Sequence, residues 1–300
     1  MKNILEGVPY GARVVVIRLR SLGDCVLTTP ALNLLKQHRP DLELSVVVED
    51  RFRAVFEGNS DVASILRPSV RTLAGWGTGL GLNLHGGTRS ALLTVASRAP
   101  VRAGFEHFSL QAAYNVRIPR AQEILGEERA VHTVEHLASA MFYLGVPRQE
   151  IPRARLFAPS SGRNGPYAVL HPFASREDKA WPAGRFLEVA RNIQADLTPV
   201  FLAGPGDDVS PFGEFETLTG APLKNVMSLI AGASLFLGND SGPAHIAAAF
   251  GIPVIVMFGP SDPAIWAPWK TTSRVLTNAK LDQIPASDVF AAAEQMRVRV

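Results

Sequence analysis

Apolar residues in the first half of the chain form continuous runs that alternate with segments of helical periodicity. The stretch "RVVVIRL" at 13–19 is typical of a strand buried on both faces, and "CVLTTPALNLLKQH" at 25–38 has the length and spacing of a helix. The same pattern predicts further strands at 42–48, 62–66 and 80–84, and further helices at 51–58, 88–98 and from His132 to about Leu144.

This alternation stops at residues 145–166 and then starts again. The segment holds four prolines and three glycines, a composition typical of a linker between domains. After it, the pattern predicts strands at 167–171, 198–204, 234–238 and 253–259, and helices at 182–194, 223–233, 242–250 and 287–297.

Two sets of buried strands separated by helices predict an α/β fold with two doubly wound, Rossmann-like domains that face a cleft. We place these domains at residues 1–158 and 159–300, and leave open whether the terminal helix packs back on the first. Parallel sheets of this kind bind ligands beyond the carboxyl ends of their strands. Candidate site residues are therefore sought in loops that directly follow a strand.

The bulk properties are those of a cytoplasmic protein with large buried cores. Of the 300 residues, 47% are hydrophobic, and the one cysteine, Cys25, excludes an internal disulfide. The N-terminal residues lack the apolar run of a signal peptide. The most apolar stretch, 246–258, is too short to span a bilayer and is interrupted by Gly251 and Pro253.

The charge is unevenly distributed between the two halves. Residues 1–158 hold 19 Lys and Arg against 14 Asp and Glu, a net +5, whereas residues 159–300 hold 11 against 13, a net −2. A basic first half suits an anionic partner such as a phosphate group, a membrane surface or nucleic acid, although a solvated basic surface accounts for it equally well. Nucleic acid is disfavoured, because only 8% of the residues are aromatic and no recognition motif occurs.

The loop after the first strand, "RLRSLGDC", contains Asp24 close to the start of a helix. Such an aspartate can be a plain helix cap, or it can serve as a general base. A helix N-terminus favours the ionised carboxylate that a base requires. The loop lacks the G-x-G-x-x-G fingerprint of dinucleotide-binding enzymes.

Two loops in the second half are suited to phosphate. In "HPFASREDKAWP", backbone amides, Ser175 and Lys179 form a candidate cradle, although a charged surface loop is the simpler interpretation. In "GNDSGPAH", Ser241 and Gly242 open a helix whose N-terminus can hold a phosphate, and Asp240 can accept hydrogen bonds from sugar hydroxyls. His245, one turn into this helix, is equally well explained as a core or cap residue.

Other strand ends carry weaker signals. Asp207 and Asp208 in "AGPGDD" suit a ribose diol or, equally, a turn, and "GPSDP" at 259–263 follows a neighbouring strand. The seven histidines are scattered and no metal motif, nucleophile elbow or P-loop is present, so no metal site is predicted.

Together, "VVVIRLRSLGDCVLTTPAL", "HPFASREDKAWP" and "GNDSGPAHIAAAFGIPVIVMFGPSDP" resemble the three hallmark stretches of the ADP-heptose:lipopolysaccharide heptosyltransferases, glycosyltransferase family 9. The similarity runs from about residue 13 to 270. It implies a GT-B fold in which the first domain binds the acceptor and the second binds the nucleotide-sugar donor.

The resemblance also implies roles for individual residues. Asp24 matches the position of the catalytic base, Ser175 and Lys179 match contacts to the donor phosphates, and the donor pocket is matched by Asp240, Ser241 and Gly242. The chain is short for the family between Asp207 and Lys224, where contacts to the donor ribose often lie.

We therefore expect an inverting, metal-independent glycosyltransferase that moves heptose from ADP-heptose to a lipopolysaccharide core acceptor, with no cofactor. The basic first half favours an anionic glycolipid acceptor at the inner membrane face, reached by peripheral contact, with Arg18, Arg20 and Arg89 nearest to it. The alternatives are a family member acting on a protein or capsule acceptor, a nucleotide-sugar 2-epimerase of the same architecture, and a non-enzymatic nucleotide-sugar-binding scaffold.

Overall fold

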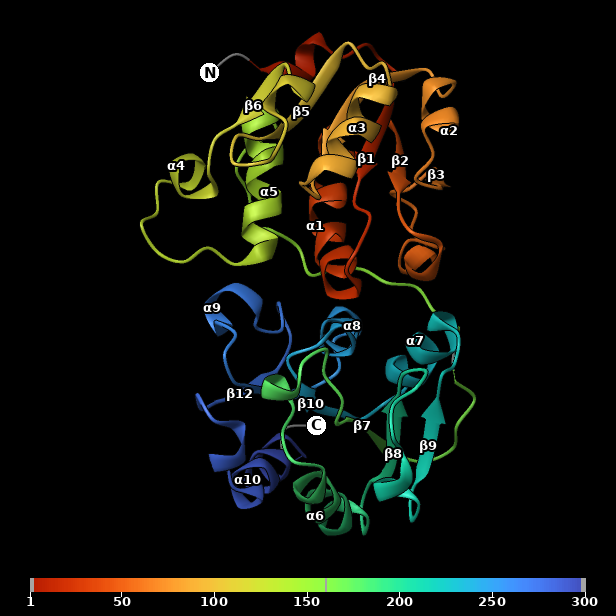
Figure 1. Cartoon of the computed structure of the whole chain (residues 1–300), viewed down its shortest axis with the longest axis vertical. Helices are drawn as coiled ribbons and strands as arrows, with labels where there is room; N and C mark the ends of the chain where they lie inside the picture. Colours follow the sequence, from red (N-terminus) through yellow and green to blue (C-terminus); the bar gives the residue numbers. More distant parts are fainter. Residues whose placement is uncertain (1–2, 160, 298–300) are drawn as a thin grey trace. The chain divides into compact units, whose positions relative to one another are not determined.

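The computed structural model describes residues 3–159 and 161–297, and the chain divides into two compact units between Phe157 and Ala158 (Figure 1). The elements of the first unit are η1 (Ile4–Gly7), β1 (Arg13–Ile17), α1 (Leu22–His38), β2 (Glu43–Val47), η2 (Asp50–Val55), β3 (Ser64–Leu66), α2 (Val70–Ala74), β4 (Thr78–Asn83), α3 (Thr88–Ala96), β5 (Val101–Phe105), η3 (Gln111–Ala113), β6 (Val116–Ile118), α4 (Ala121–Leu125) and α5 (Thr133–Leu144).

The first unit is built on one parallel sheet of six strands in the order β3-β2-β1-β4-β5-β6. Residues 14–17 of β1 are fully buried, as expected for a strand that is covered on both faces. Side chains from β1, β2 and β3 pack on one face against Leu73 of α2 and Leu93 of α3. Helix α1 packs against α5 and η2. The arrangement confirms the predicted α/β class for this half.

The second unit repeats the architecture with its own elements. They are β7 (Tyr167–His171), η4 (Glu177–Lys179), α6 (Ala183–Ile193), β8 (Thr198–Ala203), η5 (Ser210–Phe212), β9 (Glu216–Thr219), α7 (Leu223–Ala231), β10 (Leu235–Asn239), α8 (Gly242–Phe250), β11 (Val254–Phe258), α9 (Pro263–Trp266), β12 (Ser273–Thr277), η6 (Leu281–Gln283) and α10 (Ala286–Arg297).

The two sheets have the same strand order. Counted along each half, the second sheet runs β9-β8-β7-β10-β11-β12, again with every neighbouring pair parallel. The third strand lies at one edge and the sixth at the other, and the first and fourth lie side by side at the centre. This is the doubly wound order of dinucleotide-binding folds, and it confirms the predicted pair of Rossmann-like sheets.

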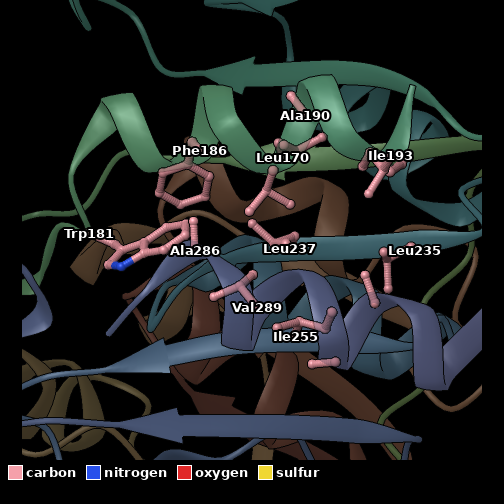
Figure 2. Close-up of a cluster of buried hydrophobic side chains, with 14 of the residues drawn as sticks. Leu170, Trp181, Phe186, Ala190, Ile193, Leu235, Leu237, Ile255, Ala286 and Val289 are labelled. Atoms are coloured by element: carbon pink, nitrogen blue, oxygen red, sulfur yellow. The ribbon is translucent and has the colours of Figure 1, made fainter. Parts of the chain in front are cut away.

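Helices α6 and α10 cover one face of the second sheet and enclose a hydrophobic cluster with its strands (Figure 2). In Figure 2, Leu170 of β7 lies beside Phe186 of α6, and Leu237 of β10 lies between Leu170 and Val289 of α10. The apolar side chains of α10, among them Val289 and Ala293, therefore pack within the second unit.

Candidate functional site

Each sheet has one topological switch point, where two neighbouring central strands lead to opposite sides of the sheet. In the first unit it lies between β1 and β4, which pair in parallel with Ile17 opposite Asn83. The loops that follow two such strands separate, and ligands of doubly wound sheets bind between them. We call the loops after β1 and β4 the first switch point, and the loops after β7 and β10 the second switch point.

Asp24 lies at the first switch point as the third residue of α1. Its Oδ2 accepts hydrogen bonds from the backbone N–H of Ser21, at 3.2 Å, and from the Ser21 hydroxyl, at 2.8 Å. Its Oδ1 accepts a hydrogen bond from the guanidinium of Arg18. The bonds to Ser21 are those of a helix cap and need no catalytic role. The bond to Arg18 lies outside the capping pattern.

Arg18 is the buried cation of the first switch point. Only 6% of its surface is exposed, and its guanidinium donates to Asp24 and to the backbone carbonyl of Leu84 in the loop after β4. One side chain thus joins both loops. A buried guanidinium is tolerated only when it is paired, so Arg18 and Asp24 require each other.

His85, which follows β4 directly, also lies here, and its role was not predicted from the sequence. Its ring hydrogen-bonds to the backbone of Arg20, and burial together with the nearby Arg18 lowers the pKa of its imidazole. Its backbone N–H donates to Oδ1 of the buried Asn83 at 2.9 Å, which holds the turn. Its place directly after a predicted strand is the signal that could have identified it.

A second histidine contributes to the same region from α5. The ring of His136 stacks on Phe105, with centroids 4.0 Å apart, and lies 5.5 Å from the ring of His107. Burial, reinforced by His107 and Arg18, lowers the pKa of His136 to about 4. The imidazole is therefore neutral near pH 7. No sequence motif marks this residue.

The two arginines proposed for acceptor binding differ in their surroundings. Arg20 is exposed on the loop after β1, and no carboxylate pairs with it in the described part of the chain. Arg89, in the first turn of α3, donates to Glu49 at 3.3 Å, and Glu49 also pairs with Arg51 at 2.9 Å. Arg20 is thus the more available of the two for an anion.

The second switch point brings together two residues that lie far apart in the sequence. Nζ of Lys179, at the end of η4, lies 3.1 Å from Oδ2 of Asp240, the first residue after β10. The lysine side chain is 24% exposed and the aspartate side chain 12%. The predicted phosphate-binding lysine and sugar-binding aspartate therefore form one ion pair beside the N-terminus of α8.

Asn239, the last residue of β10, fixes the two loops of the second switch point to each other. It is fully buried, its Nδ2 donates to the carbonyl of Pro172, and its Oδ1 accepts from the backbone N–H of Trp181, both at 2.9 Å. Trp181 is itself 1% exposed and donates its indole N–H to Ile284. The loop that carries Lys179 is anchored at both ends by these bonds.

Helix α8 begins beside this ion pair with unused hydrogen-bonding groups. Ser241 is its N-cap residue, and the buried Ser241 hydroxyl has no hydrogen-bond partner within the described residues. The buried hydroxyl of Ser261, in the loop after β11, also lacks a partner within those residues. The first N–H groups of a helix have no partner inside the helix. Such a set of donors next to Lys179 can hold an anion.

Comparisons with known proteins identify the family of the chain. The family model for glycosyltransferase family 9 (heptosyltransferase) matches residues 70–288. The chain belongs to glycosyltransferase family 9. It is therefore a glycosyltransferase, and the resemblance stated from the three loops is confirmed.

Relatives of this family 9 enzyme match it over nearly their whole length. Lipopolysaccharide heptosyltransferase 3 of Escherichia coli (strain K12) is 26% identical, over 93% of this chain and 96% of that protein. A solved family 9 glycosyltransferase from Veillonella parvula superposes with a TM-score of 0.87 at 21% identity, covering 96% and 98% of the two chains. E. coli heptosyltransferase WaaC with ADP gives 0.76 at 21% identity, covering 95% and 99%.

Several predicted donor residues of this family 9 enzyme take part in local structure. Asp207 Oδ2 accepts from the backbone N–H of Gly204 at 2.7 Å, and Asp208 Oδ1 accepts from that of Ser210 at 3.0 Å, so both aspartates organise a turn. Hydrogen bonds from Ser210 lower the pKa of Asp208. Ser175 is exposed on the loop of the second switch point, and His245 is buried in α8.

Neither a metal-binding cluster nor a membrane-spanning segment is found in the described ranges, 3–159 and 161–297. No group of three or more His, Cys, Asp and Glu side chains there is arranged to hold a metal ion. No helix within these ranges combines the length and apolar character that crossing a bilayer requires.

Proposed function

We propose that this family 9 enzyme transfers heptose from ADP-heptose to the core of a lipopolysaccharide. The proposal is supported by the E. coli relative, whose name states this class of activity, and by the related WaaC structures with ADP and with a fluorinated ADP-heptose. The observation in this chain that carries it is the Lys179–Asp240 pair beside the N-terminus of α8.

The donor is proposed to bind at the second switch point. Lys179 contacts the diphosphate, and the N-terminus of α8 at Ser241 and Gly242 adds hydrogen-bond donors. Asp240 accepts hydrogen bonds from hydroxyls of the heptose, and Ser175 is available for the phosphates. The Lys179–Asp240 contact places the two side chains next to each other, as simultaneous contact with the diphosphate and the heptose of one donor requires. Asp207 and Asp208 can bind the ribose of the donor only through a carboxylate oxygen that the turn does not use.

The acceptor is proposed to bind at the first switch point, with Asp24 as general base. Asp24 removes the proton from an acceptor hydroxyl, and that oxygen attacks the anomeric carbon of the heptose. The bond between this carbon and the phosphate oxygen breaks, ADP leaves, and the configuration at the anomeric carbon inverts. Arg18 holds the carboxylate of Asp24 in place through its two contacts.

The negative charge that develops on the departing diphosphate is proposed to be stabilised by Lys179 and the start of α8. Fixed charges and dipoles of this kind stabilise a transition state without reorganising during the reaction. We expect transfer to need no added metal. The check is to treat the enzyme with a chelator and measure transfer: unchanged turnover supports a metal-free reaction, and loss that Mg²⁺ or iron restores contradicts it.

Calorimetric titration with ADP, UDP, GDP and CDP tests the donor assignment. We expect ADP to bind with the highest affinity, and Lys179→Ala to weaken it. Preference for UDP together with isomerisation of a free UDP-sugar would favour the 2-epimerase alternative. Binding of ADP without turnover on any acceptor would favour a non-enzymatic scaffold. Turnover on a protein or capsule glycan would change the proposed acceptor and leave the proposed donor unchanged.

The acceptor is proposed to be an anionic glycolipid, presented at the cytoplasmic face of the inner membrane and reached by peripheral contact. The support is the net charge of +5 in residues 1–158 and the exposed Arg20 at the first switch point. Raising the salt concentration should raise the acceptor KM, because exposed charges are screened within about 10 Å at 0.1 M. An acceptor KM that salt leaves unchanged would favour a neutral acceptor.

A further inference from the structure

The positive charge of the first unit is concentrated in one segment. From residue 62 to residue 122 the chain has no lysine, and Glu106 is its one acidic residue. The same segment carries seven arginines, at positions 67, 71, 89, 98, 102, 117 and 120. Arg102 donates to the backbone carbonyls of Ala99 and Ala113, and the remaining arginines leave an excess of positive charge that suits an anionic partner.

The same segment also exposes large apolar side chains. Val70 is 59% exposed, Leu92 57%, Val95 50% and Leu110 49%. Val70 begins α2, Leu92 and Val95 lie on α3, and Leu110 immediately precedes η3. Leu92 and Val95 are three residues apart on one helix and so share one side of it.

The three elements that carry these side chains are neighbours in the fold. Helix α3 contacts both α2 and η3, and in Figure 1 α3 lies in front of the strands with α2 beside it. We call the solvent-exposed side of α2, α3 and η3 the α2–α3–η3 face. It combines four exposed apolar side chains with the arginines of the same elements.

Two arginines on or next to this face form no salt bridge within the described residues. Arg71 on α2 and Arg98 after α3 are exposed, and neither has a carboxylate partner among residues 3–159 and 161–297. Arg67 and Arg89, by contrast, pair with Asp50 and Glu49. Arg71 directly follows the exposed Val70, and Arg98 lies three residues after the exposed Val95, so both are available for a partner that is both anionic and apolar.

We propose that the α2–α3–η3 face binds the surface of an anionic lipid bilayer. Leucine and valine side chains enter the boundary between headgroups and acyl chains, while Arg71 and Arg98 contact lipid phosphates. The charge complementarity favours lipid over a second copy of the chain, because two such faces would repel each other. Nucleic acid is disfavoured, because the exposed apolar side chains are aliphatic and cannot stack on bases.

The position of α3 connects this face to the site. Helix α3 begins at Thr88, three residues after His85 of the first switch point. A bilayer bound along α3 would therefore bring a lipid-linked acceptor close to Asp24. This consequence rests on the proposed function, whereas binding of the face to lipid does not.

Vesicle co-sedimentation of the full chain tests the proposal. Wild type is mixed with vesicles of phosphatidylcholine alone or of phosphatidylcholine with phosphatidylglycerol. We expect binding to the anionic vesicles, weakened by added salt. Arg71→Gln with Arg98→Gln should lower the partition coefficient about 10- to 30-fold, since each arginine near the surface contributes about a factor of five. Leu92→Ser with Val95→Ser should lower it about tenfold or more.

Matched controls test whether lipid binding depends on this face or on any exposed or charged side chain. Tyr10→Ser alters a side chain that is 90% exposed outside the face, and Arg191→Gln removes an exposed charge on α6 of the second unit. Both should bind vesicles as wild type does. Circular dichroism and ADP affinity confirm that each variant is folded, and transfer to a water-soluble acceptor is measured separately, so loss of lipid binding is distinguished from loss of function.

Three results would overturn the proposal. Wild type fails to bind anionic vesicles, or binds neutral vesicles equally well, or binds anionic vesicles with no change in either double variant. A wild type that stays off vesicles but forms a dimer, which Leu92→Ser with Val95→Ser dissociates, would assign the face to a second copy instead.

Discussion

The two units share a strand order but build their switch points differently. In each, the central strand that follows the crossover ends in a fully buried asparagine, Asn83 in β4 and Asn239 in β10. Asn83 accepts hydrogen bonds from His85 and Gly86 in the turn that follows it, at 2.9 and 3.1 Å. Asn239 instead reaches across to the loop after β7. Asn83 also donates to the hydroxyl of Tyr114 at 2.8 Å, so it fixes its own turn to a segment outside the switch point, whereas Asn239 joins the two loops of its switch point to each other.

The ion pairs at the two switch points differ in the same way. The cation of the first, Arg18, is buried, and Asp24 is held by a helix cap as well as by that arginine. The cation of the second, Lys179, is partly exposed on a loop, and one lysine–carboxylate contact joins it to Asp240. Several contacts therefore hold the ion pair of the first switch point, whereas a single contact holds that of the second.

The largest effect is expected at the carboxylate of the first switch point. Asp24→Asn should lower kcat about 10²- to 10⁴-fold, the range usual for loss of a general base, and leave ADP affinity unchanged. Steady-state transfer kinetics and ADP calorimetry on the same preparation measure both. Near-normal turnover would show that the role of Asp24 is structural, as a helix cap and as the partner of Arg18.

Ser21→Ala is the matched control for that variant. It removes the capping hydroxyl that donates to Asp24 but keeps the carboxylate and its bond to Arg18. We expect a loss of about 1 kcal/mol in stability, typical of an N-cap, with turnover within a few-fold of wild type. A loss of turnover as large as that of Asp24→Asn would mean that orientation by the cap, not proton removal, is what matters.

At the ion pair of the second switch point, Lys179→Ala should weaken ADP binding about 10- to 100-fold and lower kcat as well. A charge-assisted hydrogen bond is worth about 1.5–3 kcal/mol, and the charge on the leaving diphosphate grows in the transition state. Calorimetry and transfer kinetics measure the two effects, with Arg191→Ala on α6 as the control for a removed charge. Unchanged ADP affinity would leave the Lys179 loop as ordinary surface.

A fall in pH should destabilise the first unit through protonation of His136. Its folded-state pKa of about 4 lies below the ordinary 6.5, so below about pH 6.5 the unfolded chain takes up a proton that the folded chain excludes. Stability is therefore lost as the pH falls from about 6.5 toward 4. Between pH 7 and pH 5 this histidine should account for about 2 kcal/mol.

Urea unfolding of wild type and His136→Gln at both pH values tests this expectation. The variant should lose less stability on acidification, and hydrogen exchange should place the difference in α5 rather than in α6. His171 at the second switch point also has a pKa lowered by burial. It is present in both proteins, so its contribution to the loss of stability cancels in the comparison. Equal losses in the two proteins would show that His136 is protonated without cost in the folded state.

The smallest effects are expected at the exposed arginines. Arg20→Ala should raise the acceptor KM about two- to five-fold, consistent with the modest energy of an exposed charge contact. Arg89→Ala should do less, since Arg89 is already paired with Glu49. Donor affinity should not change in either variant. Acceptor kinetics indifferent to both substitutions would remove the charge argument for an anionic acceptor.

The central strands and long helices could be predicted from the sequence because each carries a strong local pattern. The runs that predicted strands at 13–19, 80–84, 167–171 and 234–238 correspond to the central strands β1, β4, β7 and β10. The edge or near-edge strands β5, β6, β9 and β12 were missed, because "VRAGF", "VRI", "ETLT" and "SRVLT" are short and mix polar with apolar residues. A strand at or near the edge of a sheet can keep more polar side chains, so its sequence lacks the apolar run from which a buried strand is predicted.

The candidate site was predictable only where a residue lies in the segment between a predicted strand and the first turn of the next helix. Asp24, Lys179 and Asp240 were found in this way, and the structure places the last two in contact. Arg18 was expected near the acceptor, but its burial and its bond to Leu84 depend on β4 lying beside β1, which the sequence does not specify. His136 was missed for the same reason, because tertiary packing alone brings α5 close to Phe105 and Arg18.

The most direct test of the account is a transfer assay with ADP-heptose and a lipopolysaccharide inner-core acceptor, read by mass spectrometry of the acceptor and by release of ADP. The account predicts one heptosyl unit added per ADP released, with inverted anomeric configuration, and loss of both signals in Asp24→Asn while ADP binding persists. Release of ADP without an acceptor, or an unmodified acceptor in the presence of bound ADP-heptose, would contradict it.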